Sequence, residues 1–225
     1  MEANEIKILN PQDVEMELNK SAIEHRDADF SGKILPNLSL AERHLDYGLN
    51  LNNATITGNV FLADLEVNGN VNFENAAIMG SMFFGRGKII GNLTLNKVTV
   101  GQSINLVGLN ITGFLTLEQA KVFGFVSLTK AVVLSDINCR KIEIMDYSQS
   151  DLVIKGDLYF KSAQINGLLD ITESTISGMV NLDSALIRKN FIAQNAFIGD
   201  NLLLKDAIII GGVDLLGIPP EKIIQ

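Results

Sequence analysis

The sequence predicts an all-β protein, a parallel four-sided β-helix solenoid with a short capping helix at its N-terminus. Three observations predict it. An 11-residue unit that begins with glycine repeats without gaps over residues 58–91 and continues through most of the chain. Apolar and polar residues alternate within it over only three residues at a time. Counting the glycine as position 0, position 9 is Ile or Val in all fifteen units, from Ile56 to Ile209.

These short alternations define the fold because they are strands too short to pair as hairpins along the chain. Each can pair only with the equivalent strand one coil away. Two units, about 22 residues, make one four-sided coil, and a three-sided coil of 33 residues is the alternative. We expect seven to eight coils over residues 25–218, with the position-0 glycines supplying the backbone freedom of tight corners.

The N-terminal segment, residues 1–24, contains a helix start signal. Asn10 suits the N-cap and Pro11 the first helical position. A helix over residues 11–22 would place Val14 and Leu18 on its inner face, with Ile23 near the edge of that face. This helix would cover the first open coil, and residues 219–225 would form a C-terminal tail.

The repeat register slips once. Gly156 follows Ser135 by 21 residues instead of 22. In this register Cys139, Tyr147 and Gln149 occupy core positions, and Met145–Ser150 should form a local bulge or kink. We expect no insertion long enough to wall an active site, so a polysaccharide-acting β-helix enzyme is the least favoured class.

One stretch resembles a known family. Ala28-Asp29-Phe30-Ser31-Gly32 is similar to the motif of pentapeptide-repeat proteins, and large apolar residues recur every five positions through Leu45. Lys33 and Arg43 replace the small residue that the motif prefers. The resemblance implies a right-handed, four-sided coil. Some members are acidic dimeric rods that resemble duplex DNA and bind topoisomerases, so a DNA-mimicking regulator of a DNA-binding enzyme is an alternative function.

The composition narrows the function classes. The net charge of −8 opposes direct binding of nucleic acid or anionic lipid. The excess of acidic residues is unevenly distributed along the chain. Residues 1–57 carry ten acids and five bases, whereas residues 58–212 carry fourteen acids and twelve bases. The chain has neither a signal-peptide pattern nor an apolar run that could span a membrane. The single cysteine rules out an internal disulfide, and a cytoplasmic protein is the expectation.

Few residues are candidates for chemistry. His25 and His44 are the only histidines, and acids lie near both in the sequence. They could form a metal or acid–base site, but a solvated surface beside the capping helix is favoured. Cys139 should be a buried, inert thiol. We therefore expect no catalytic, cofactor or metal site, and not an enzyme.

Outward apolar residues are the best candidates for an interaction surface. They are Met79, Phe83, Phe114, Phe123, Phe125, Leu186, Phe197, Ile208 and Ile210. The alternative is that such side chains stack on one another along the rod. Gly217-Ile218-Pro219-Pro220 is a thin cap, which favours an end-to-end homodimer. The predicted function is a non-enzymatic protein-interaction or scaffold module whose protein partner the sequence does not identify.

Overall fold

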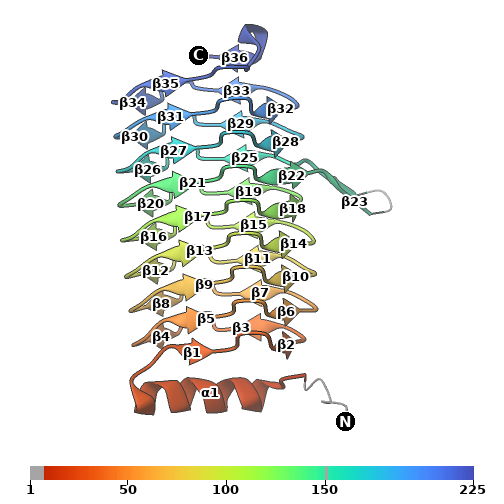
Figure 1. The fold of residues 1–225 in the computed structure, drawn as a ribbon, viewed down its shortest axis with the longest axis vertical. Helices are drawn as coiled ribbons and strands as arrows, with labels where there is room; N and C mark the ends of the chain where they lie inside the picture. Colours follow the sequence, from red (N-terminus) through yellow and green to blue (C-terminus); the bar gives the residue numbers. More distant parts are fainter. Residues whose placement is uncertain (1–7, 150–151) are drawn as a thin grey trace.

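The chain forms a parallel β-solenoid with helix α1 (Pro11–Glu24) lying across its N-terminal end (Figure 1). The computed structural model describes residues 8–149 and 152–225. Four parallel sheets run along the rod, so the predicted all-β, four-sided fold is confirmed. Each coil visits sheets 1, 2, 3 and 4 in turn, which places sheets 1 and 3 on opposite sides of the rod and sheets 2 and 4 on the other two.

Sheets 1 and 2 contain the first two strands of each coil. Sheet 1 contains β1 (Ala28–Asp29), β5 (Leu49–Asn50), β9 (Val71–Asn72), β13 (Leu93–Thr94), β17 (Leu115–Thr116), β21 (Ile137–Asn138), β27 (Leu169–Asp170), β31 (Phe191–Ile192) and β35 (Val213–Asp214). Sheet 2 contains β2 (Ile34–Leu35), β6 (Thr55–Ile56), β10 (Ala77–Ile78), β14 (Thr99–Val100), β18 (Lys121–Phe123), β22 (Glu143–Met145), β28 (Thr175–Ile176) and β32 (Phe197–Ile198).

Sheets 3 and 4 complete each coil. Sheet 3 contains β3 (Leu38–Ser39), β7 (Val60–Phe61), β11 (Met82–Phe83), β15 (Ile104–Asn105), β19 (Val126–Ser127), β25 (Leu158–Tyr159), β29 (Val180–Asn181), β33 (Leu202–Leu203) and β36 (Ile223–Ile224). Sheet 4 contains β4 (His44–Leu45), β8 (Glu66–Val67), β12 (Lys88–Ile89), β16 (Asn110–Ile111), β20 (Val132–Val133), β26 (Gln164–Ile165), β30 (Leu186–Ile187) and β34 (Ile208–Ile209). The short helix η1 (Pro220–Lys222) precedes β36.

The rod has about nine coils, more than the seven to eight expected. The regular coils hold 22 residues, as in the pairing of Val60 with Met82. The sequence estimate counted only 11-residue units. It left out the first coil, whose Ala28 pairs with Leu49 of the second, and the strand that the tail adds to sheet 3.

The core is an axial column of apolar side chains. Phe30, Phe73, Phe84, Phe160 and Phe191 are all fully buried, and buried Leu, Ile, Val and Ala fill the same column between them. Burying a side chain of this size stabilises the fold by about 1.5–3 kcal/mol. Position 9 is confirmed as a core position throughout the regular coils, with one exception, Ile154, described below.

The corner glycines act differently from the prediction. Among the position-0 glycines Gly124 has a positive φ (137°), but left-handed backbone occurs mainly at position 6, at residues such as Asn53 (φ 57°) and Asp64 (φ 58°). Glycine is favoured at position 0 where successive coils approach closely: a Cβ on Gly58 would lie 2.6 Å from the Pro36 carbonyl oxygen. The asparagine after the glycine joins coils, since Asn59 Oδ1 accepts from the Ser81 amide at 2.8 Å.

The capping helix forms as predicted. Asn10 and Asp13 exchange hydrogen bonds in a capping box, with distances of 2.9 and 3.0 Å. Val14 and Leu18 are buried against the first coil. Ile23 is 78% exposed, so its predicted place near the inner face is wrong. Ser21, three residues after Leu18, occupies the inward position instead.

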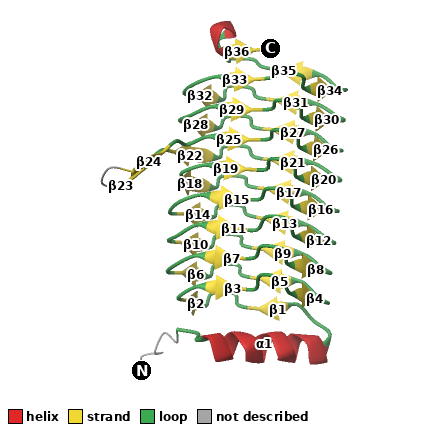
Figure 2. Ribbon diagram, turned by 180° about the vertical axis from the view of Figure 1, so that it is seen from behind, coloured by secondary structure: helices red, strands yellow, loops and turns green. Residues whose placement is uncertain are grey.

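One coil carries an insertion that the sequence interpretation missed. Val126 pairs with Leu158, 32 residues later, so this coil is ten residues longer than the regular 22. The extra residues form an antiparallel hairpin of β23 (Tyr147–Gln149) and β24 (Leu152–Ile154). The predicted bulge at Met145–Ser150 is therefore wrong for the described residues 145–149, and Ser150 lies outside them. Figures 1 and 2 show the hairpin projecting from the side of the rod.

Candidate interaction surfaces

The hairpin leaves the rod at the edge between sheets 2 and 3, where Asp146 closes its neck. The Asp146 carboxylate accepts from the Gly156 amide at 2.9 Å and from the Ser177 hydroxyl of the next coil at 2.6 Å. These hydrogen bonds lower the pKa of Asp146, and Lys155 at 3.5 Å adds to the effect. Asp146 thus links the two sides of the neck to each other and to the next coil.

The two faces of the hairpin differ in character. Tyr147 pairs with Ile154 and Gln149 with Leu152, so these four side chains share one face. Ser148 and Val153 lie on the other. Leu152 is 56% exposed and Val153 58%. Because the hairpin forms a separate two-stranded sheet, its outer strand edges join no other strand of the described chain, which leaves them open to pairing.

Apolar residues line the corner of the rod from which the hairpin leaves, over the coils that precede it. Met79, Phe123 and Met145 occupy the same corner at the end of sheet 2, and Phe123 pairs directly with Met145. Met79 is 56% exposed, whereas the other two are half-buried. Phe125, at the start of sheet 3, meets Tyr159 edge to face at 6.3 Å. We call Met79, Phe123, Phe125, Met145 and the hairpin the 2–3 edge.

Tyr159 adds a polar group beside this edge. Its hydroxyl donates to the Asp157 carboxylate at 2.6 Å. Burial and the nearby carboxylate raise the pKa of Tyr159 to about 12, so it stays a neutral donor. Asp157 also accepts from the Met179 amide at 2.8 Å, which links the foot of the hairpin to the next coil.

The other predicted surface residues are scattered over the rod. Phe83 stacks on Phe61 across sheet 3, with ring centroids 5.4 Å apart, so the alternative of stacking along the rod holds for Phe83. Phe114 and Ile210 lie at the edge between sheets 4 and 1, and Leu186 and Ile208 are on sheet 4. Phe197 is on sheet 2, where Lys222 lies over its ring at 5.5 Å. The nine residues therefore do not form one patch.

The sequence interpretation missed Tyr147, Leu152 and Val153 as surface residues. It placed Tyr147 in the core because Tyr147 and Ile154 fit positions 2 and 9. A signal was present, since this apparent unit has Met145 where glycine belongs and the polar Gln149 at a core position. Cys139 is correctly placed: it is fully buried, and burial raises the pKa of its thiol, which disfavours the reactive thiolate.

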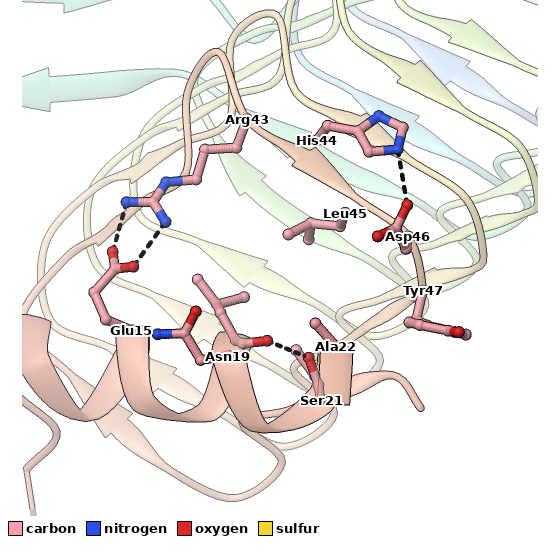
Figure 3. Close-up of a pocket in the computed structure, with 12 residues that line it drawn as sticks. Glu15, Asn19, Ser21, Ala22, Arg43, His44, Leu45, Asp46 and Tyr47 are labelled. Atoms are coloured by element: carbon pink, nitrogen blue, oxygen red, sulfur yellow. Dashed lines mark hydrogen bonds and ion pairs between the residues drawn. The ribbon is translucent and has the colours of Figure 1, made fainter. Parts of the chain in front are cut away.

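His44 lines a groove between α1 and β4, and so does Tyr47, the residue that His25 contacts (Figure 3). His25 Nδ1 is 2.6 Å from the Tyr47 hydroxyl. The imidazole of His44 is 3.2 Å from Asp46 and 3.4 Å from Glu66. Among the described residues, no group of three or more His, Cys, Asp or Glu side chains is arranged to hold a metal ion. The His44 side chain is 51% exposed, in keeping with the favoured solvated surface.

No protein-family model and no curated protein sequence matches this chain. Its class therefore comes from its structure: it is a repeat protein, a regular parallel β-solenoid of 22-residue coils. Within residues 8–149 and 152–225, no helix is long and apolar enough to cross a membrane.

Proposed function

We propose that this chain is a non-enzymatic protein-interaction scaffold of the pentapeptide-repeat kind, which binds a protein partner through the 2–3 edge. The observation that carries the proposal is the hairpin, because it interrupts an otherwise regular repeat and exposes Leu152 and Val153. Aromatic and methionine side chains beside it add the apolar contacts typical of an interface centre. The tied neck supports a defined geometry for the hairpin.

The surface charges support this function over the acidic DNA mimic. Opposite charges face each other between successive coils, as in Arg86 with Asp64 at 2.6 Å and Lys121 with Glu143 at 3.1 Å. A DNA mimic needs a continuous negative face, and such pairs interrupt it. We also propose that the protein works in the cytoplasm, in keeping with its single, buried cysteine, and cell fractionation would test this.

Site-specific photo-cross-linking tests the scaffold function. A photoreactive residue replaces Val153 in cells that express the protein, and a matched control replaces Leu134, which is 50% exposed at the edge between sheets 4 and 1. We expect one defined partner to cross-link from position 153 and to be lost when Phe123 and Phe125 are changed to Ser. Identical cross-linked proteins from both positions would contradict the proposal.

A second candidate is an end-to-end homodimer through the C-terminal coil. Ile208, Ile210 and Leu216 are 60%, 62% and 66% exposed there, and Val213 and Ile224 add to this apolar end. Sedimentation equilibrium of the wild type and of Ile208→Lys with Leu216→Lys tests it. We expect the double variant to weaken self-association, and a wild type that stays monomeric at high concentration would exclude the dimer.

A further inference from the structure

The groove beside α1 is bounded by an open strand edge. It encloses ≈ 320 Å³ between the helix and the start of sheet 4, and Leu18, Ala22 and Leu45 form its apolar part. Figure 3 shows β4 running above the helix across this gap. In sheet 4 each coil pairs with the coil above, and β4 is the first strand, so its other side faces the groove.

The backbone of β4 has hydrogen-bonding groups directed into the groove. The carbonyls of Arg43 and Leu45 accept from the Glu66 and Asn68 amides of the next coil, at 2.9 and 2.8 Å. Alternate residues of a parallel strand direct their backbone groups to opposite sides. The amides of His44 and Asp46 therefore point toward α1, where no described residue accepts from them.

The first strands of sheets 1 and 2 are already covered. Under β1, the Asp29 amide donates to Glu17 Oε1 at 2.9 Å, and the Asp27 carbonyl accepts from Arg26 at 2.8 Å. Under β2, the Ile34 carbonyl accepts from the Leu9 amide at 2.8 Å. The segment around α1 thus supplies substitutes for a missing strand on sheets 1 and 2 and leaves a groove at β4.

The charges at the rim indicate which peptide would fill the gap. Arg43 is neutralised by two hydrogen bonds to Glu15, at 2.9 and 2.5 Å. Asp46 and Glu66, with side chains 68% and 59% exposed, flank His44 and leave negative charge at the opening. An extended strand there would direct alternate side chains toward Leu18 and Leu45 and the others toward these carboxylates.

We infer that this groove binds an extended peptide of a partner protein, in which small apolar and basic residues alternate, as an added strand of sheet 4. The peptide pairs with His44 and Asp46 through its main chain, which gives affinity, while its alternate side chains give selectivity. This site is separate from the 2–3 edge, so either proposal can fail without the other.

Fluorescence anisotropy with labelled Lys-Val-Lys-Val-Lys tests the inference. We expect saturable binding, at least tenfold weaker binding of Glu-Val-Glu-Val-Glu, and none of a peptide N-methylated at alternate amides. Methylation removes the peptide donors that would pair with the His44 carbonyl, which faces α1 on the same side of β4 as the His44 amide. Bound peptide should shift the NMR signals of the His44 and Asp46 amides and slow their hydrogen exchange. Equal binding of the N-methylated peptide, or shifts that map elsewhere, would overturn the inference, as would no binding at millimolar concentration.

A matched pair of helix variants locates the site. Ala22→Arg fills the groove, whereas Met16→Arg adds the same charge at a residue that is 70% exposed and does not line the groove. We expect Ala22→Arg to weaken peptide binding at least tenfold and Met16→Arg to change it less than twofold. Circular dichroism confirms that both variants fold, and equal weakening by both would contradict a peptide seated in the groove.

Discussion

Two successive corners between sheets 2 and 3 differ in length, although the sheets on either side of them are unchanged. In the regular corner, Gly124 alone joins Phe123 to Phe125. One coil later, residues 146–156 join Met145 to Asp157, and they include the hairpin. The sheets continue through both, since Ile144 still pairs with Ile176 and Val126 with Leu158. A corner can therefore carry an insertion without disrupting the packing of the core, because the strands on either side keep their partners.

The largest expected difference is between a core residue beside the hairpin and a residue on it. Phe160→Ala removes a fully buried ring two residues after Leu158, which should lower the free energy of unfolding by about 3–5 kcal/mol. Leu152→Ala on the hairpin should change it by less than about 0.5 kcal/mol. Urea denaturation measures both. Equal losses would mean that the hairpin belongs to the cooperative core.

The neck should tolerate less change than the hairpin itself. A Cβ on Gly156 would lie 2.2 Å from the Ser177 hydroxyl oxygen and 2.8 Å from the Met145 carbonyl carbon. Gly156→Ala should therefore cost about 1–3 kcal/mol of unfolding free energy. Gly212→Ala is the control, since its nearest contact would be 3.8 Å away. Thermal unfolding would refute this idea of the neck if both variants matched the wild type.

The hydrogen bonds of Asp146 should make the neck sensitive to acid. Because the pKa of Asp146 in the folded protein lies below its ordinary 3.8, its contribution is complete above that pH and is lost as the pH falls through the folded value. Asp146→Ala should cost about 1 kcal/mol at pH 7, given its partial exposure, and less at pH 2–3. Denaturation across pH measures this difference.

Removing the whole hairpin should also have only a small effect on stability. Replacing residues 146–156 with a single glycine copies the corner at Gly124 and restores a 22-residue coil. The free energy of unfolding should change by less than about 1 kcal/mol, since the sheets are unaffected and the loop is shorter. Chemical denaturation and circular dichroism check it. A loss above about 3 kcal/mol would show that the hairpin stabilises the rod.

Val133 and Ile154 show which structural features the repeat pattern can predict and which it cannot. Both fit the Ile or Val of position 9, yet Val133 is fully buried and Ile154 lies in the hairpin. Periodicity records which residues could alternate on a strand, but not which strand they pair with. The ten inserted residues come within one residue of a repeat unit, so the count alone could not separate an insertion from an irregular unit.

The candidate sites were predictable only in part. The outward position of Met79, Phe123 and Phe125 follows from the repeat, and so do the corner columns they share. The unpaired amides of His44 and Asp46 could not be predicted from the repeat. They depend on where α1 ends and on which first strands α1 and the residues beside it cover.

The sequence by itself determined the parallel solenoid, its 22-residue coil, its apolar axis and the capping helix. These follow from residue types at fixed spacings, since each coil meets the same environment as its neighbours. Only the tertiary structure decided that the described residues 146–149 and 152–156 leave the rod, that the nine outward apolar residues fall on different sides, and that a groove lies under β4. The physical reason is that these features depend on pairing between segments distant in the chain, which a local pattern does not encode.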